Sequence, residues 1–147
     1  AYTQMHEQLT AAGHADAIEA VLVQPMVSSG VEVMAGMTVD PVFGPIVAFG
    51  LGGIMVEVLE DVAFRLTPLS ERDAREMLSS IRGRALLDGF RGSPVVDKDA
   101  LVQILLRVSQ LSDRIPEIDD LDLNPIFIGA RGEGARVVDV RIHVGQA

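Results

Sequence analysis

The chain of 147 residues has the length of one domain, and its composition is that of a folded protein. Hydrophobic residues make up 48% and charged residues 22%, which excludes a largely disordered chain. With 12 Lys and Arg against 21 Asp and Glu, the net charge of -9 has the wrong sign for a protein that binds a nucleic-acid backbone. The absence of cysteine also excludes disulfides, thiolate catalysis and zinc held by cysteine.

No stretch of the sequence has the pattern of an export signal or a membrane span. The N-terminal residues lack a basic stretch followed by an apolar core, so no signal peptide is predicted. The longest uncharged stretch, residues 41–56, is shorter than the about 18 apolar residues that cross a bilayer, and it contains Pro and Gly. We therefore expect a cytoplasmic domain over residues 1–147 without a membrane partner. Because it starts without Met, we expect it to be part of a longer chain.

The first half of the sequence predicts a short helix followed by three strands. A helix is expected over residues 3–13, where apolar side chains recur at helical spacing. Residues 20–27 are strongly apolar and predict an edge strand with a bend at its proline. Residues 31–39 have a period of two and predict a half-buried strand, joined to the preceding one by a turn at residues 28–30. A third strand is expected over residues 46–49.

The middle of the sequence predicts two helices. Ser70 and Asp73 resemble a capping box that begins a helix, and Gly83 is expected to end it. Asp99 is expected to cap a second, longer helix, which Pro116 ends. Apolar residues recur along both helices at helical spacing, so each should have one apolar face.

A β-hairpin closes the sequence, with strands over residues 121–128 and 135–144 and a loop at 129–134. Strands in hairpins, mixed with separate helices, indicate an α+β fold with a mainly antiparallel sheet rather than a doubly wound parallel sheet. If the loop is centred between Arg131 and Gly132, the register of the two strands follows from counting outward on both sides.

This register places Asn124 opposite Asp139 and Asp122 opposite Arg141. Directly opposed Cβ atoms lie about 4.5–5.5 Å apart, so an amide oxygen and a carboxylate would converge on one face beside a second carboxylate. Such hard oxygen ligands suit Mg²⁺, which takes one or two protein ligands and fills its other positions with water and phosphate oxygens. The alternative is a surface ion pair between Asp122 and Arg141 and a strand that simply ends at Asn124.

Two further features fit either a nucleotide site or an ordinary strand. The sequence Gly-Leu-Gly-Gly at residues 50–53 matches neither a dinucleotide fingerprint nor a P-loop, but its glycines let a backbone approach a phosphate. The alternative is a tight bend after a strand. Glu32 stands among apolar neighbours and is suited to accept hydrogen bonds from ribose hydroxyls, or it is simply solvated. The three histidines show neither metal-ligand spacing nor a triad.

Together these segments resemble the C-terminal part of the ATP-grasp module of ADP-forming acyl-CoA synthetases. This group includes acetate–CoA ligase and is related to succinyl-CoA synthetase β-subunits. The resemblance runs from about Ile18 to Ile142. Its matching stretches have the order and spacing of the family; they are VLVQPMVSSGVEVMAG (21–36), DPVFGPIVAFGLGGIMVEVLEDVAFRLTPL (40–69), LLDGFRGSP (86–94) and DLDLNPIFIGARGEGARVVDVRI (120–142).

The resemblance implies a nucleotide-binding role for one set of residues. The hinge whose backbone meets the adenine is matched by Val23, Gln24, Pro25 and Met26. Glu32 matches the carboxylate that holds the ribose. Gly52 and Gly53 match the glycine loop near the phosphates, and Glu57 follows that loop. The nucleotide implied is ATP or ADP.

The resemblance also implies a metal site and a reaction. Asn124 and Asp139, which the hairpin register brings together, match the family's Mg²⁺ ligands. Asp122 matches the acidic residue that approaches a phosphohistidine on a swinging segment, so it is the expected catalytic residue. The implied function is the nucleotide- and Mg²⁺-binding half of an ADP-forming acyl-CoA ligase, which converts acyl-CoA, ADP and phosphate to carboxylic acid, CoA and ATP. The alternative is a regulatory, non-catalytic module fused to a GNAT acetyltransferase.

The sequence also departs from the complete family pattern. The N-terminal ATP-grasp subdomain with its phosphate-binding lysines, the CoA-binding domain or subunit, and the phosphohistidine segment have no match here, and the one lysine, Lys98, lies outside any phosphate motif. We expect these parts to be partners that complete the cleft. Alone, the chain should bind ATP no better than about millimolar, because its negative charge repels a triphosphate. Uncovered apolar strips at Val21–Val27 and Phe43–Phe49 should favour self-association.

Overall fold

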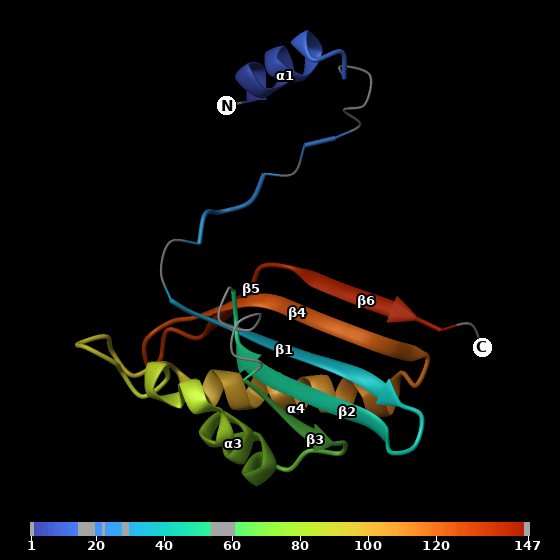
Figure 1. Ribbon diagram of the computed structural model, residues 1–147, viewed down its shortest axis with the longest axis vertical. Coiled ribbons are helices and arrows are strands. Elements are labelled where there is room, and N and C mark those ends of the chain that lie inside the picture. The colour runs from blue at the N-terminus through green and yellow to red at the C-terminus, as the bar shows by residue number, and fades with distance from the viewer. Residues whose placement is uncertain (1, 15–19, 22, 28–29, 54–60, 146–147) are drawn as a thin grey trace.

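The computed structural model describes residues 2–14, 20–21, 23–27, 30–53 and 61–145. Its body is a six-stranded antiparallel sheet with helices packed on one side (Figure 1). The elements in chain order are α1 (Tyr2–Ala11), β1 (Val31–Asp40), β2 (Gly44–Leu51), β3 (Val62–Leu66), α3 (Glu71–Ser80), the 3-10 helix η2 (Arg82–Leu86), α4 (Lys98–Arg114), β4 (Ile118–Ile128), β5 (Ala135–Val137) and β6 (Val140–Val144). The predicted α+β class with a mainly antiparallel sheet is confirmed.

The strands lie side by side in the order β3-β2-β1-β4, and β4 pairs with both β5 and β6. β1 is central, with β2 on one side and β4 on the other. Its Val33, Ala35 and Met37 are buried, because successive side chains of a strand point to opposite faces and these three face the helices. The predicted half-buried strand over residues 31–39 is therefore confirmed.

The strand predicted over residues 20–27 is wrong for the residues described there. Residues 20–21 and 23–27 form no strand, and the side chains of Val23 and Met26 are 88% and 89% exposed. β1 forms its hairpin with β2 instead, and its other edge is taken by β4, so the preceding segment has no place beside it. The sequence also gave no prediction for β3, which pairs with β2 at the edge of the sheet.

The helices α3 and α4 cover one face of the sheet (Figure 1). α4 packs across β1, β2 and β4, and α3 lies beside α4 and β3. Leu105 of α4 and Val47 and Phe49 of β2 are completely buried in this layer. Each such side chain contributes about 1.5–3 kcal/mol by leaving water. The apolar strip predicted at Phe43–Phe49 is thus only partly uncovered, since Phe43 is exposed, Ile46 and Ala48 are half-buried, and Val47 and Phe49 belong to the core.

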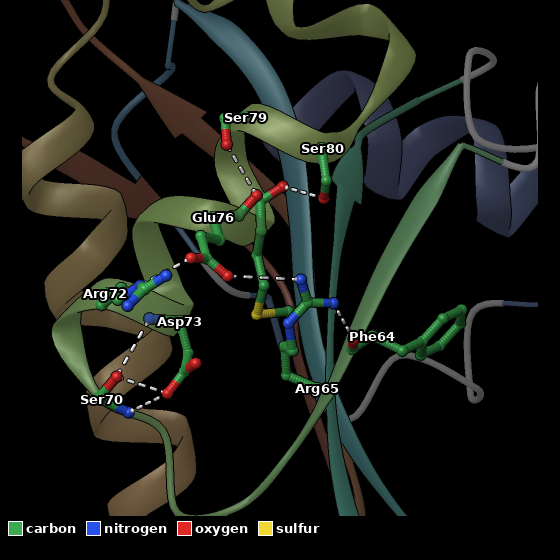
Figure 2. Close-up of polar contacts among 9 residues, drawn as sticks. Phe64, Arg65, Ser70, Arg72, Asp73, Glu76, Ser79 and Ser80 are labelled. Atoms are coloured by element: carbon green, nitrogen blue, oxygen red, sulfur yellow. Dashed lines mark hydrogen bonds and ion pairs between the residues drawn. The ribbon is translucent and has the colours of Figure 1, made fainter.

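α3 begins with the predicted capping box, shown in Figure 2. The backbone N–H of Asp73 donates to Ser70 Oγ at 3.2 Å, and the N–H of Ser70 donates to Asp73 Oδ2 at 2.9 Å. The side-chain and backbone bonds from Ser70 lower the pKa of Asp73. One turn later, Glu76 pairs with Arg72 at 2.9 Å and lies 3.9 Å from Arg65 of β3, which links the helix to the edge strand.

The prediction that Gly83 ends α3 is wrong. α3 ends at Ser80, and Gly83 lies within η2. The buried carboxylate of Asp61, directly before β3, accepts hydrogen bonds from the N–H groups of Arg82 and Gly83, both at 2.7 Å. Glycine is needed here for another reason, because a Cβ atom would collide with the side chain of Leu51.

Asp97, not Asp99, caps α4. One carboxylate oxygen of Asp97 accepts from the N–H of Ala100 at 3.1 Å, and the other accepts from the N–H groups of Gly132 at 2.9 Å and Gly134 at 3.1 Å. The bond from Ala100 is the largest cause that lowers the pKa of Asp97. Asp97 is favoured over Asp99 because it caps the helix and holds the loop between β4 and β5 at the same time.

The predicted N-terminal helix is confirmed as α1, but it lies apart from the sheet (Figure 1) and has no buried residue. Its apolar side chains therefore pack on nothing in the described part of the chain. None of the helices described is both long enough and apolar enough to cross a bilayer.

Candidate functional site

The side of the sheet that faces away from α3 and α4 is covered by no helix of the described chain (Figure 1), and we call it the open face. On β1 it carries Glu32, Met34, Gly36 and Thr38, which alternate with the buried residues of that strand. Residues of the neighbouring strands that pair with these four share the open face with them.

Cross-strand pairs form rows over the open face from β3 to β6. One row consists of Phe64, Ala48, Gly36, Asp122 and Arg141. The next row consists of Leu66, Ile46, Thr38, Asp120 and His143. The open face is therefore apolar over β3 and β2, and charged over β4 and β6.

The closing hairpin has the register predicted from its loop. Asp122 of β4 pairs with Arg141 of β6. Next to this pair, the N–H of Asn124 donates to the carbonyl oxygen of Asp139 at 3.3 Å. Asn124 and Asp139 thus lie opposite each other on the open face, and both residues are exposed. The structure brings the two predicted oxygen donors together, one residue pair away from Asp122.

Charged groups surround Asp122. This residue is half-buried, and its burial is the largest cause that raises the pKa of its carboxyl group. Asp120 and Asp139 raise this pKa further, whereas the guanidinium of Arg141 lowers it. Arg141 also lies beside Asp139, with 3.5 Å between Nε and Oδ2. A single arginine therefore lies among three carboxylates at this end of the open face.

The chemistry of these donors fits Mg²⁺. Asn124 offers an amide oxygen and Asp139 a carboxylate, and both are hard ligands. In the part of the chain that the structure describes, no three His, Cys, Asp or Glu residues gather into a metal cage. Mg²⁺ does not require one, since it commonly takes one or two protein ligands and completes its shell with water and phosphate oxygens. As metal ligands, Asn124 and Asp139 remain a prediction.

Glu32 lies against the glycine pair that follows β2. The N–H of Gly52 donates to the carbonyl oxygen of Glu32 at 2.7 Å. Gly53 has a φ of 63°, and a Cβ atom there would lie 2.6 Å from Oε2 of Glu32. Glycine is needed at this position both for its conformation and for its closeness to the carboxylate. The residues predicted for the ribose and for the phosphates are therefore neighbours in space.

The remaining predicted nucleotide residues are not brought to this group. The described residues of the predicted hinge lie outside any strand; they are Val23, Gln24, Pro25 and Met26. Glu57 lies outside the described residues. The sequence analysis assigned Arg141 no role beyond a surface ion pair, although its position two residues after Asp139 places it on the same face as the metal pair.

Two surface hollows lie on the helix side of the sheet, away from the open face. One, of about 410 Å³, runs along α3. The other, of about 390 Å³, lies between α3 and the start of α4 and is lined by Arg75, Arg84 and Lys98. Two of these cations have carboxylate partners, since Lys98 pairs with Asp88 and Arg75 pairs with Asp99, and Arg84 donates to the carbonyl oxygen of Ser79 at 3.2 Å. Neither hollow is lined by a residue of the predicted site.

The sequence matches the family model of the ATP-grasp domain over residues 1–144. The chain belongs to the ATP-grasp family. It is 50% identical over 123 residues to the β subunit of ADP-forming acetate–CoA ligase II from Pyrococcus furiosus, a match covering 83% of this chain and 52% of that subunit. It is 46% identical over 129 residues to ADP-forming acetate–CoA ligase I from Archaeoglobus fulgidus, covering 88% of this chain and 18% of that protein.

A solved ATP-grasp structure has the same fold. It is acetyl-coenzyme A synthetase 1 of Ca. Korarchaeum cryptofilum, in complex with coenzyme A and Mg-AMPPCP, with its phosphohistidine segment pointing towards the nucleotide binding site. The TM-score is 0.81 at 41% identity, covering 94% of this chain and 64% of that one. The predicted resemblance to ADP-forming acyl-CoA synthetases is confirmed. The chain spans about half the length of the Pyrococcus β subunit and less than a fifth of the Archaeoglobus ligase.

Proposed function

We propose that this ATP-grasp chain is the nucleotide- and Mg²⁺-binding C-terminal part of an ADP-forming acyl-CoA ligase. The observation that carries the proposal is the pairing of Asn124 with Asp139 on the open face. Two oxygen donors meet there by strand register, next to a carboxylate whose burial raises its pKa. The relatives support the proposal, because the most similar ones reported above are ADP-forming acetate–CoA ligases.

In this proposal, the nucleotide lies along the open face from Glu32 toward the metal pair. The carboxylate of Glu32 accepts hydrogen bonds from the ribose hydroxyls, and the N–H groups around Gly52 and Gly53 approach the phosphates. The hinge segment at residues 23–26 meets the adenine through its backbone, and Glu57 follows the glycine loop. The support comes from the contact of Glu32 with the two glycines and from the family resemblance.

Asn124 and Asp139 would hold Mg²⁺ in this site. The ion supplies positive charge that neutralises phosphate oxygens during a largely dissociative phosphoryl transfer. Asp122 lies beside the pair, where its carboxylate would hold and orient the phosphohistidine that arrives from another part of the ligase. The half-buried position of Asp122 suits this role, because a partly desolvated carboxylate makes stronger hydrogen bonds than a solvated one.

The complete reaction requires more chain than these residues. We propose acyl-CoA + ADP + phosphate ⇌ carboxylic acid + CoA + ATP, with the phosphoryl group passing through an acyl phosphate and a phosphohistidine to ADP. The partners are the N-terminal ATP-grasp subdomain and a CoA-binding domain or subunit. The length comparison supports this, since the Pyrococcus relative is itself a β subunit of which this chain covers 52%. The relatives reported above are CoA ligases and synthetases, so they give no support to the GNAT alternative.

The test is calorimetric titration of Mg-ADP into a ligase that contains this chain with the rest of its ATP-grasp region. Asn124 is the one asparagine of the sequence, and Asn124→Ala should weaken binding about tenfold or more, because the metal loses a ligand. Gln103→Ala, on the exposed side of α4, is the matched control and should change nothing. If the unmodified ligase does not bind Mg-ADP, or if both variants bind it equally, the proposal is wrong.

A further inference from the structure

The open face has few basic side chains. Of the 12 Lys and Arg residues of the chain, two occupy strand positions on the open face of the described sheet, Arg136 and Arg141. Arg136 pairs with Phe127, which in turn pairs with Glu32, so it lies toward the Glu32 end. Arg141 lies in the row next to the Asn124 and Asp139 pair, at the opposite end.

Among the described residues, the side chain of Arg141 makes only a long ion pair with Asp139. Its Nε lies 3.5 Å from Oδ2 of Asp139, which is longer than the about 2.7–2.9 Å of a charge-assisted hydrogen bond. Its side chain is 79% exposed, and every residue of the edge strand β6 is exposed. The guanidinium therefore keeps its N–H donors and the space to turn toward a ligand on the open face.

The charge balance of the site calls for a cation here. Asp120, Asp122 and Asp139 are three carboxylates close together, and their rows contain one arginine, Arg141, and one histidine, His143, which lies 3.9 Å from Asp119. A nucleoside diphosphate adds further negative charge, so one divalent ion leaves the site with a negative excess. An arginine also fits phosphate in a specific way, because its planar fork offers two parallel N–H groups to two oxygens and stays charged at any working pH.

We propose that Arg141 binds the terminal phosphate of the nucleotide, and that it pairs with Asp139 when no nucleotide is bound. This inference rests on the proposed function and assigns a further substrate-binding residue to the same site. Arg141 then shares the phosphate with the Asn124 and Asp139 pair, and the ion pair seen here is its resting position. The residue thereby selects for nucleotides with a phosphate beyond the first.

The test compares ADP with AMP, which lacks the terminal phosphate, in a ligase that contains this chain. Binding is measured by calorimetry at fixed Mg²⁺ for the unmodified protein and for Arg141→Gln, Arg141→Lys and Arg107→Gln. We expect Arg141→Gln to weaken ADP binding about tenfold or more and to leave AMP binding unchanged. Arg141→Lys should keep part of the ADP affinity. Arg107→Gln removes the same charge from the exposed side of α4 and should change neither affinity.

Each other outcome has a definite meaning. Unchanged ADP binding in Arg141→Gln overturns the inference and leaves the proposed function intact. Equal losses for ADP and AMP, together with a lower melting temperature, overturn it in favour of a structural role for the pair with Asp139. An unmodified ligase that binds AMP but not ADP overturns the inference and the proposed function together.

Discussion

The two faces of the sheet are built from the same strands but differ in role: one packs against the helices, and the other carries the candidate site. The face under α3 and α4 is mainly apolar and is covered by these helices over the centre of the sheet, with Val33, Val47 and Phe49 completely buried. The open face changes from apolar side chains on β3 to carboxylates and an arginine on β4 and β6. Since the side chains of a strand alternate between faces, each strand contributes to both. Stability and the candidate site can therefore be altered separately by choosing odd or even positions of one strand.

The largest effect should follow from removing a side chain on the face under α3 and α4. Phe49→Ala should lower the free energy of unfolding by about 3–5 kcal/mol, because it leaves a cavity in a packed core. Phe64→Ala is the control one strand away, where the side chain is 57% exposed, and should cost about 1 kcal/mol or less. Urea denaturation followed by circular dichroism measures both. Similar losses in the two variants would contradict the difference between the faces.

On the open face, Asp139→Ala should affect nucleotide binding strongly and stability little. Loss of a metal ligand should weaken Mg-ADP binding about 100-fold in a ligase that contains this chain. Asp122→Ala should weaken it much less, because Asp122 is assigned to the phosphohistidine, and should instead slow phosphoryl transfer. Titration calorimetry and a single-turnover transfer assay separate the two. Equally negligible losses of affinity would leave the hairpin with a structural role alone.

At the other end of the open face, Glu32→Gln tests whether Glu32 binds the ribose. If its carboxylate accepts hydrogen bonds from both ribose hydroxyls, the variant should lose about 1.5–3 kcal/mol of ADP binding. It should also lose most of its preference for ADP over 2′-deoxy-ADP, since the deoxynucleotide lacks one of the two donors. The ratio of the two affinities is the quantity to measure. A ratio that is the same in the variant and the unmodified protein would contradict the ribose role.

The smallest effect is expected at Asp97, which links the start of α4 to the loop between β4 and β5. Asp97→Ala removes the cap of α4 and the contact to the loop at residues 129–134, and should lower the melting temperature by about 2–4 °C at pH 7. The pKa of Asp97 is lowered in the folded state, so its contribution is present above the ordinary pKa of aspartate and is lost as the pH falls through the folded value. Melting curves of Asp97→Ala and Asp99→Ala between pH 3 and 7 should differ above the ordinary pKa and converge at the acid end.

Local rules were enough to predict several features of the molecule. The period of two in β1 identified its buried face, and the capping box placed the start of α3. The hairpin register followed from counting outward from its loop, and it placed Asn124 opposite Asp139 correctly. These predictions succeeded because each depends on residues close in sequence.

The failures depend on partners distant in sequence. The segment 20–27 is apolar enough for a strand, but β2 and β4 take both edges of β1. Asp97 and Asp99 are equally good caps by type, and the loop that selects Asp97 is more than thirty residues away, at Gly132 and Gly134. Arg141 is a different case, because its second partner, Asp139, is only two residues away on the same face, so the alternation of side chains was sufficient to predict their contact.

The loop at residues 129–134 constrains how this sequence can change by descent. A single-residue insertion that the loop does not absorb would shift the register and move Asp139 from the open face to the helix side, because every residue of the following strand would exchange faces. An insertion of two residues would keep the face but give Asn124 a different partner. Substitutions in the loop must preserve the N–H groups that reach Asp97, and Gly132 and Gly134, which donate them, have φ angles of 87° and 76° that favour glycine. Among functional descendants, this loop should therefore keep its positive-φ glycines, and a change of length that shifts the register would separate Asn124 from Asp139.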